Sequence, residues 1–239
     1  DQALALSEVP PSLLIVGGGV IGCEFAALFS ALGSLVTVIE KLPALLPGED
    51  KEISRKLETV FKKKGIQVLT ASDILAQDLN NYSKVLVCVG RTAQVDNLGL
   101  NDAGVKLGKH GIEVDDYLAS SQENIYAAGD CTAKLMLAHY AAYQGILAVE
   151  NMFSGNKRKA DNQIIPACIF TDPQIASVGA RENDSAVYPE AVKVRRFDFR
   201  ANAMAQIAEE TEGFIKIITD ESANRIIGGS IMGPQASEL

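Results

Sequence analysis

The stretch that decides the fold runs from Leu13 to Phe25 and reads LLIVGGGVIGCEF. Leu13–Val16 is a short, continuous apolar run, which is typical of a strand buried on both faces of a parallel sheet. Beyond the glycines, apolar residues recur at helical spacing as far as Gly33, where the helix is expected to end. The sequence therefore predicts a strand, a glycine-rich turn and a helix, in that order.

The glycines of this turn follow the pattern GxGxxG, in which each glycine has a separate task. Gly17 permits the tight turn, and Gly19 leaves out a side chain where a pyrophosphate would approach. Gly22 lets the helix pack closely on the strand, so that the helix N-terminus faces the phosphates. The predicted dinucleotide contacts in the turn are Gly17, Gly18, Gly19, Val20, Ile21 and Gly22.

The next predicted strand, Leu35–Ile39, ends at Glu40, which lies 23 positions after the first glycine of the turn. A carboxylate at this place can accept hydrogen bonds from an adenosine ribose and would repel a 2′-phosphate. The sequence therefore favours NAD over NADP. A tight turn in some other α/β fold is the alternative interpretation of the same glycines.

The following segments extend this α/β pattern. An amphipathic helix is predicted over Glu49–Lys64, and strands are predicted at Ile66–Leu69 and Val85–Arg91. The last strand is expected to be buried and to end where its backbone can touch a cofactor. The predicted cofactor contacts in this part of the chain are Ile74, Val89, Gly90 and Arg91.

Composition limits the function classes. The 239 residues carry 22 lysines and arginines against 30 acids, a formal net charge of −8, which disfavours nucleic acid as a partner. No apolar run reaches the ~18 residues of a membrane helix and no signal peptide opens the chain, so a cytoplasmic protein without membrane contact is expected. The cysteines lie far apart, which predicts buried thiols and no metal site; they are Cys23, Cys88, Cys131 and Cys168.

Several long motifs, in this order, resemble the pyridine nucleotide-disulfide oxidoreductases, and among them the dihydrolipoamide dehydrogenases. VPPSLLIVGGGVIGCEFA resembles their NAD-binding loop, and VCVGR resembles the strand end that closes over the dinucleotide. NIYAAGDCTAKLMLAHYAAYQG (Asn124–Gly145) resembles their second FAD fingerprint. Ile165–Gly179, Phe197–Ile218 and the final IMGPQASEL resemble their dimerisation domain.

The FAD-like segment also has a physical interpretation. Ile125–Ala128 is predicted to be a buried strand, followed by a close turn at Gly129 and a hydroxyl-binding carboxylate at Asp130. The next residues are predicted to open a helix whose positive end faces the flavin. The predicted flavin contacts are Gly129, Asp130, Met136, Leu137, Ala138 and His139. The resemblance implies that His139 acts through its backbone, and that Glu24 lies near the nicotinamide end of NAD.

From about Ile164, short β-rich runs alternate with turns, which predicts an antiparallel sheet in an α+β domain. The predicted architecture is a Rossmann-like NAD-binding domain at 1–92, the C-terminal part of an FAD-binding domain at 93–162, and a truncated dimerisation domain at 163–239. An apolar sheet of this kind needs a cover. The resemblance implies that a second subunit supplies it in a homodimer, and cover by the chain's own helices is the alternative.

The chain also departs from the family it resembles. The family's redox-active CxxxxC pair and its His–Glu pair have no counterpart, so no catalytic residue is predicted, and no lipoamide turnover is expected from these residues alone. Two internal stretches look short, because each missing strand needs ~5 residues. We therefore expect a fragment of a longer chain with hidden breaks near Asn80 and Asn183, where consecutive Cα atoms would lie farther apart than ~3.8 Å.

The resemblance implies a flavoprotein of 2-oxo acid dehydrogenase complexes. Such a protein passes electrons from dihydrolipoamide, free or on a lipoyl domain, through a disulfide and FAD to NAD. Mercuric reductase, soluble transhydrogenase and NADH oxidase share the same dinucleotide loops and are alternatives. A non-catalytic NAD-binding or dimerisation module is the alternative outside the enzymes, although Asp130 and the MLAH stretch argue against it.

Overall fold

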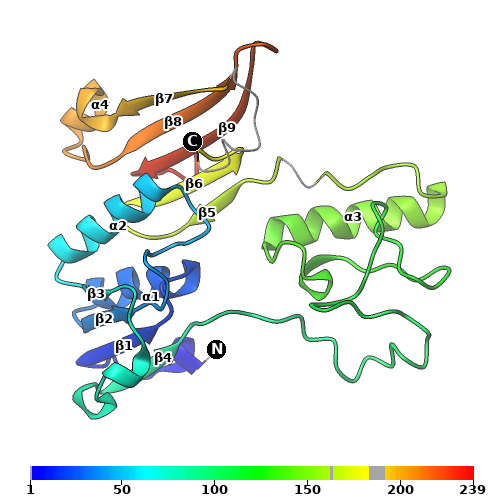
Figure 1. The fold of residues 1–239 in the computed structure, drawn as a ribbon, viewed down its shortest axis with the longest axis horizontal. Helices are drawn as coiled ribbons and strands as arrows, with labels where there is room; N and C mark the ends of the chain where they lie inside the picture. The colour runs from blue at the N-terminus through cyan, green and yellow to red at the C-terminus, as the bar shows by residue number, and fades with distance from the viewer. Residues whose placement is uncertain (1, 162–163, 183–191) are drawn as a thin grey trace. The chain divides into compact units, whose positions relative to one another are not determined.

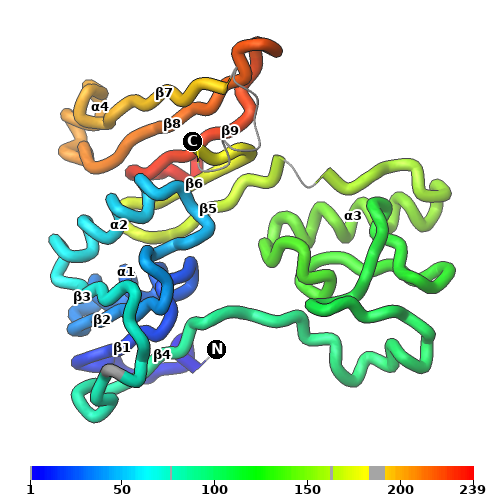
Figure 2. The backbone as a smooth tube through the Cα atoms, viewed as in Figure 1, coloured from blue at the N-terminus to red at the C-terminus, as the bar shows by residue number. Residues whose placement is uncertain are grey.

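A computed structural model describes residues 2–161, 164–182 and 192–239. The chain forms two compact units. The first takes in the chain up to Gly90 together with Pro166–Leu239, and the second runs from Arg91 to Ile165. Figure 2 follows the backbone through both, from blue at the N-terminus to red at the C-terminus. Asn183, where a break is predicted, lies outside the described residues.

The first unit contains a parallel sheet of four strands in the order β3-β2-β1-β4 (Figure 1). The strands are β1 (Ser12–Val16), β2 (Leu35–Ile39), β3 (Gln67–Leu69) and β4 (Lys84–Val87). Helix α1 (Val20–Ala31) links β1 to β2, and α2 (Lys51–Lys63) links β2 to β3. This order of parallel strands confirms the predicted Rossmann-like fold.

The same unit contains an antiparallel sheet in the order β5-β6-β9-β8-β7, which was predicted as well. Its strands are β5 (Ala167–Ile169), β6 (Gln174–Gly179), β7 (Val192–Asp198), β8 (Phe214–Asp220) and β9 (Arg225–Gly233), with the short helix α4 (Ala203–Ile207) after β7. Side chains alternate along β8, so that Phe214, Lys216 and Ile218 are buried.

One hydrophobic core joins the two sheets, with α2 between them (Figure 1). The buried residues of α2 recur at helical spacing; they are Ile53, Ser54, Leu57, Val60 and Phe61. Phe214 and Met232 of the antiparallel sheet belong to the same cluster as Leu57 and Phe61. The two sheets of this unit therefore bury their apolar side chains in one common core.

The second unit holds helix α3 (Ala138–Ser154) and a 3-10 turn, η4 (Gly129–Thr132). The predicted strand Ile125–Ala128 is wrong, because within the described residues this segment forms only one isolated bridge, between Tyr126 and Ala119. A strand needs a partner along its length, and Ala119 is the single partner found there. Among the helices that the structure describes, none is both long enough and apolar enough to span a membrane.

Strand β4 differs from the strand that the sequence predicts at Val85–Arg91. The run Val85–Arg91 was expected to be a buried strand, but β4 lies at the edge of the parallel sheet and ends at Val87. Leu86 packs against the core. The side chains of Val85, Val87 and Val89 are instead 38%, 63% and 73% exposed. One face of this strand therefore has no cover among the described residues.

The connection between β3 and β4 is made of two short 3-10 turns, η2 (Ile74–Ala76) and η3 (Leu79–Asn81). The described backbone runs through Asn80, whose amide donates to Asp78 Oδ1 at 3.0 Å. Turn η3 therefore spans the position at which the break near Asn80 is predicted.

We expect Leu57→Ala to lower the free energy of unfolding of the first unit by about 2–5 kcal/mol, because it opens a cavity in the core that both sheets share. Leu35→Ala is the matched control: Leu35 is 75% exposed, and its truncation should change stability by no more than about 0.5 kcal/mol. Urea unfolding of both variants measures the difference. Equal losses would contradict the shared core.

Candidate functional site

The glycine-rich turn lies at the carboxyl edge of the parallel sheet, between β1 and α1. Gly17 has φ +110°, and its amide donates to the carbonyl of Ile39 at 2.8 Å. A Cβ at Gly17 would lie 2.4 Å from the carbonyl oxygen of Cys88, and a Cβ at Gly22 would lie 1.9 Å from that of Gly17. Both positions therefore require glycine, for the turn and for close packing of helix on strand.

Gly19 differs from these two glycines. It is the N-cap of α1, with an extended backbone, and a Cβ added there would meet no atom within 4 Å. The first turn of α1 contains no acidic residue, and its amides at Val20, Ile21 and Gly22 have no acceptor within the helix. The open space at Gly19 therefore adjoins the positive end of a helix, which suits a phosphate.

Glu40 follows β2 and turns its side chain toward the glycine loop. It is only 9% exposed. Its Oε2 accepts a hydrogen bond from the amide of Gly18 at 2.6 Å, and its Oε1 accepts one from the amide of Leu42 at 2.7 Å. The structure thus brings together the carboxylate and the glycines that the sequence analysis assigned to one site.

The remaining predicted contacts of the first unit are more dispersed. Val89 and Gly90 follow β4 at the same sheet edge, and a Cβ at Gly90 would meet nothing within 4 Å. Ile74 is half-buried in η2. Glu24, expected near the nicotinamide, accepts a hydrogen bond on Oε1 from the amide of Phe170 at 2.9 Å. In the structure Glu24 therefore ties α1 to the end of β5.

The predicted flavin contacts gather within the second unit. Gly129 has φ +76°, and a Cβ there would lie 2.9 Å from the Cβ of Ala141. Asp130 is partly exposed, with its Oδ2 3.7 Å from Arg91 Nη2. Helix α3 begins at Ala138 with Leu137 as its N-cap, so Met136, Leu137, Ala138 and His139 surround the helix start. The first turn of α3 has no acidic residue.

Sequence reasoning missed two residues that hold these loops. The amide of Leu46 donates to the carbonyl of Gly18 at 2.8 Å, which fixes the far side of the glycine loop. Gln144 is fully buried, and its Oε1 accepts from the amide of Gly129 at 2.7 Å. A polar residue on the buried side of α3 was the available signal for Gln144, whereas nothing in the sequence marks Leu46.

Of the four thiols that were predicted to be buried, only Cys23 is; Cys88, Cys131 and Cys168 are partly exposed. Burial raises the pKa of Cys23 to about 12, and burial also raises the pKa of Cys88 and of Cys168. Thiols with a raised pKa are weak nucleophiles near neutral pH. All four cysteines are free, and the part of the chain that the structure describes has no group of three or more metal-binding side chains.

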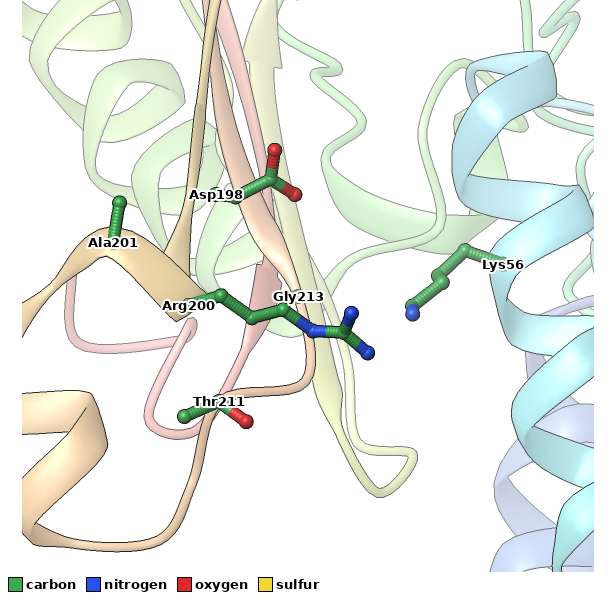
Figure 3. A pocket seen from close by; sticks show the side chains of 6 residues that line it. All are labelled: Lys56, Asp198, Arg200, Ala201, Thr211 and Gly213. Atoms are coloured by element: carbon green, nitrogen blue, oxygen red, sulfur yellow. The ribbon is translucent and has the colours of Figure 1, made fainter.

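A cavity of about 400 Å³ lies between α2 and the antiparallel sheet, away from the predicted site residues (Figure 3). Figure 3 shows Lys56 reaching into it from α2 and Arg200 from the opposite side. Both cations pair with Glu212, Lys56 at 2.5 Å and Arg200 at 3.9 Å, and Lys63 pairs with the same carboxylate at 3.1 Å. Glu212 therefore neutralises the basic side chains around the cavity.

Comparison with known proteins adds independent findings. A family profile described as "Pyridine nucleotide-disulphide oxidoreductase" matches residues 1–145. A second profile, described as the dimerisation domain of the same family, matches residues 165–239.

Curated relatives match the chain throughout. A dihydrolipoyl dehydrogenase of Bacillus subtilis is 35% identical over 258 aligned positions, which cover all of this chain and 54% of that protein. One from Chlamydia trachomatis is 40% identical and covers 99% of this chain and 54% of its own length. The chain thus spans about half the length of the curated relatives it matches. The alignment with the Bacillus protein is longer than the 239-residue chain, so that relative has positions without a counterpart here.

Solved structures give the same result. The Cu(II) complex of the HOCl-induced flavoprotein disulfide reductase RclA from Escherichia coli superposes with a TM-score of 0.91 at 26% identity, covering 99% of this chain and 58% of that one. LpdA from Mycobacterium tuberculosis superposes with a TM-score of 0.88 at 30% identity, covering 99% and 55%.

We expect Gly22→Ala to destabilise the first unit by at least about 1–3 kcal/mol, because its Cβ would overlap the carbonyl of Gly17. Gly19→Ala is the matched control, since its Cβ enters open space at φ −73°, and only about 1 kcal/mol of N-cap preference is at stake. Thermal unfolding compares the two variants. A larger loss for Gly19→Ala than for Gly22→Ala would contradict the described turn.

A second prediction concerns pH. Lys56 and Lys63 lower the pKa of Glu212 from its ordinary 4.5 to about 2. Because the pKa is depressed on folding, the stabilisation is fully present above pH 4.5 and is lost as the pH falls toward 2. Between pH 4.5 and pH 2, Glu212→Gln should therefore lose less free energy of unfolding than wild type. Urea unfolding at several pH values measures the difference. Its neighbour Glu210 is exposed, and Glu210→Gln should follow wild type. Parallel curves for wild type and Glu212→Gln would refute the pairing.

Proposed function

Because the chain belongs to the pyridine nucleotide-disulphide oxidoreductase family, we propose that it binds NAD through residues 17–22 and Glu40, as part of a dihydrolipoyl dehydrogenase. Members of the family use FAD and a pyridine nucleotide, and dihydrolipoyl dehydrogenases use FAD and NAD. Identities of 35% and 40% to proteins of that name, against 26% to RclA, favour this branch of the family.

The observation that carries the proposal is the combination of an open helix N-terminus with a carboxylate beside it. The amides of the first turn of α1 can donate to a diphosphate, and a Cβ at Gly19 would meet no atom within 4 Å. Glu40 faces the same loop and can accept hydrogen bonds from the two hydroxyls of a ribose. A 2′-phosphate in that place would meet a buried negative charge, so NAD is favoured over NADP.

The residues of the chain then have defined tasks. The amides of α1 hold the diphosphate, Glu40 holds the adenosine ribose, and Gly90 leaves room for the cofactor at the end of β4. Glu24 lies one helical turn into α1, and we propose that it lies toward the nicotinamide. When bound, NAD supplies the hydride acceptor and FAD relays the electrons.

For FAD, we propose that the second unit contributes one part of the site. Asp130 can accept hydrogen bonds from ribityl hydroxyls, and Gln144 fixes the turn at Gly129 that presents it. The start of α3, at residues 136–139, has no acid in its first turn to compensate the helix dipole. Its amides favour the negative charge that a reduced flavin carries. Arg91 pairs loosely with Asp130 and lies at the rim of the proposed site.

We further propose the division into an NAD-binding domain (1–92), part of an FAD-binding domain (93–162) and a dimerisation domain (163–239). A match to the family's dimerisation domain supports a homodimer, as do exposed apolar side chains of the antiparallel sheet such as Phe197 and Ile226. We also propose docking to a 2-oxo acid dehydrogenase complex in the cytoplasm, with dihydrolipoamide or a lipoyl domain as the substrate; the names of the dihydrolipoyl dehydrogenase relatives support this proposal.

Titration of the protein with NAD and NADP tests the proposal. Wild type should bind NAD more tightly than NADP. Glu40→Ala should weaken NAD binding about 10–100-fold, because a charged acceptor contributes about 1.5–3 kcal/mol. Glu40→Ala should also bring the affinities for NAD and NADP closer together.

Glu58→Ala is the matched control, because Glu58 pairs only with Lys62 among the ion pairs of the described residues, on the exposed side of α2. It should bind NAD as wild type does. Equal affinity of wild type for NAD and NADP, or unchanged NAD binding by Glu40→Ala, would count against the assigned role of Glu40.

A further inference from the structure

A buried lysine joins the two sheets of the first unit. Lys216 lies on the inward face of β8 and is 1% exposed. Its Nζ is 2.9 Å from Glu52 Oε2 and 3.6 Å from Asp50 Oδ2, and it also donates to the carboxylate of Glu182. Asp50 and Glu52 belong to the N-terminal end of α2. A cation in the antiparallel sheet therefore gathers the acids at the start of this helix.

Asp50 is held firmly by this arrangement. It is 1% exposed, and its Oδ1 accepts from the amide of Glu182 at 3.0 Å. Its Oδ2 lies 3.3 Å from Ser230 Oγ on β9, as well as near Lys216. All of these partners come from the chain after Pro166. Contacts from that part of the chain therefore hold Asp50, the last residue before α2, in place.

A continuous run of hydrogen bonds leads from Asp50 to the glycine loop. The carbonyl of Asp50 accepts from the amide of Ser54 at 3.0 Å, and it is one of two carbonyl acceptors at 3.3 Å for the single hydroxyl proton of Ser54. The same Oγ lies 3.3 Å from the carbonyl of Leu46. The amide of Leu46 donates to the carbonyl of Gly18 at 2.8 Å, and the amide of Gly18 donates to Glu40.

We propose that Lys216 is a positioning residue for the dinucleotide site, acting through Asp50 and the segment 41–50 on Gly18 and Glu40. The inference rests on the proposed binding of NAD by this loop. Lys216 touches no cofactor. It fixes the position of Asp50, and the segment that follows β2 then holds the glycine loop and the carboxylate in the geometry that receives the nucleotide.

The chemistry of Lys216 supports a task beyond packing. It alternates with Phe214 and Ile218 on a buried strand face, where an apolar side chain of similar length would pack without desolvating a charge. A buried lysine is tolerated there because three carboxylates surround it. Those same carboxylates lose their common cation if the lysine is removed, and Asp50 then keeps only the hydrogen bonds from the Glu182 amide and from Ser230 Oγ.

Lys216→Met tests the proposal, because methionine keeps an unbranched side chain of nearly the same length and removes the charge and the hydrogen-bond donors. NAD affinity should fall about 10-fold, within the range typical of coupling between sites. Lys193→Met is the matched control: Lys193 makes the same kind of pair, with Glu221 at 3.3 Å, on the exposed side of the neighbouring strand β7. It should bind NAD as wild type does.

Hydrogen exchange gives a readout that does not depend on NAD. Amides of the segment 41–50 and of Gly18 should exchange faster in Lys216→Met than in Lys193→Met, with α3 unchanged. If wild type binds no NAD, the proposed function fails, and exchange alone decides whether Lys216 orders the loop. If wild type binds NAD and Lys216→Met matches it in both affinity and loop exchange, the positioning role is overturned.

A further variant and a double-mutant cycle test the route through Asp50, and the variant, Ser54→Ala, keeps the test decisive if Lys216→Met does not fold. Ser54→Ala removes the hydroxyl between Asp50 and Leu46 and should weaken NAD binding in the same direction. In a double-mutant cycle, Lys216→Met combined with Asp50→Asn should cost less affinity than the two single losses summed, because both act through one contact. Unchanged affinity in Ser54→Ala, or full additivity in the cycle, would refute the route through Asp50.

Discussion

The contact between Gly22 and the carbonyl of Gly17 is the constraint on which the site depends. Since no side chain intervenes, α1 begins directly above the end of β1, and a Cβ at Gly22 would lie 1.9 Å from that oxygen. The first turn of α1 consequently begins at Gly19, where an added Cβ would meet no atom within 4 Å. The same turn puts Gly18 within reach of Glu40, which closes the other side of the loop at 2.6 Å.

The antiparallel sheet does more than cover an apolar surface. Its residues share one core with the parallel sheet and also contact both elements that follow the glycine loop. Glu24 on α1 accepts from the amide of Phe170, and Asp50 before α2 meets Lys216. Residues of the predicted dimerisation domain thus contact the chain on two sides of the proposed cofactor site.

Much of this arrangement could be predicted from local patterns. The strand Leu35–Ile39 has the bounds that its apolar run and flanking residues indicate, because a two-sided buried strand leaves a clear signal. Val85–Arg91 gave the same signal, but burial depends on what lies over the strand, which the run itself does not encode. The strand prediction for Ile125–Ala128 was wrong for a similar reason, because a strand needs a partner and the apolar run does not show whether one is present. Nothing in the run Phe214–Ile218 marks Lys216 as buried, because a lysine is expected on the exposed face of a strand, and its link to Asp50 likewise needs the three-dimensional structure.

The most direct measurement is a crystal structure of the protein with NAD bound. We predict diphosphate oxygens within about 2.7–3.2 Å of the backbone amides in the first turn of α1. We also predict that the adenosine ribose hydroxyls donate to the Glu40 carboxylate. A nucleotide bound away from the carboxyl edge of the parallel sheet would contradict the account. So would a complex in which Glu40 points away from the ribose.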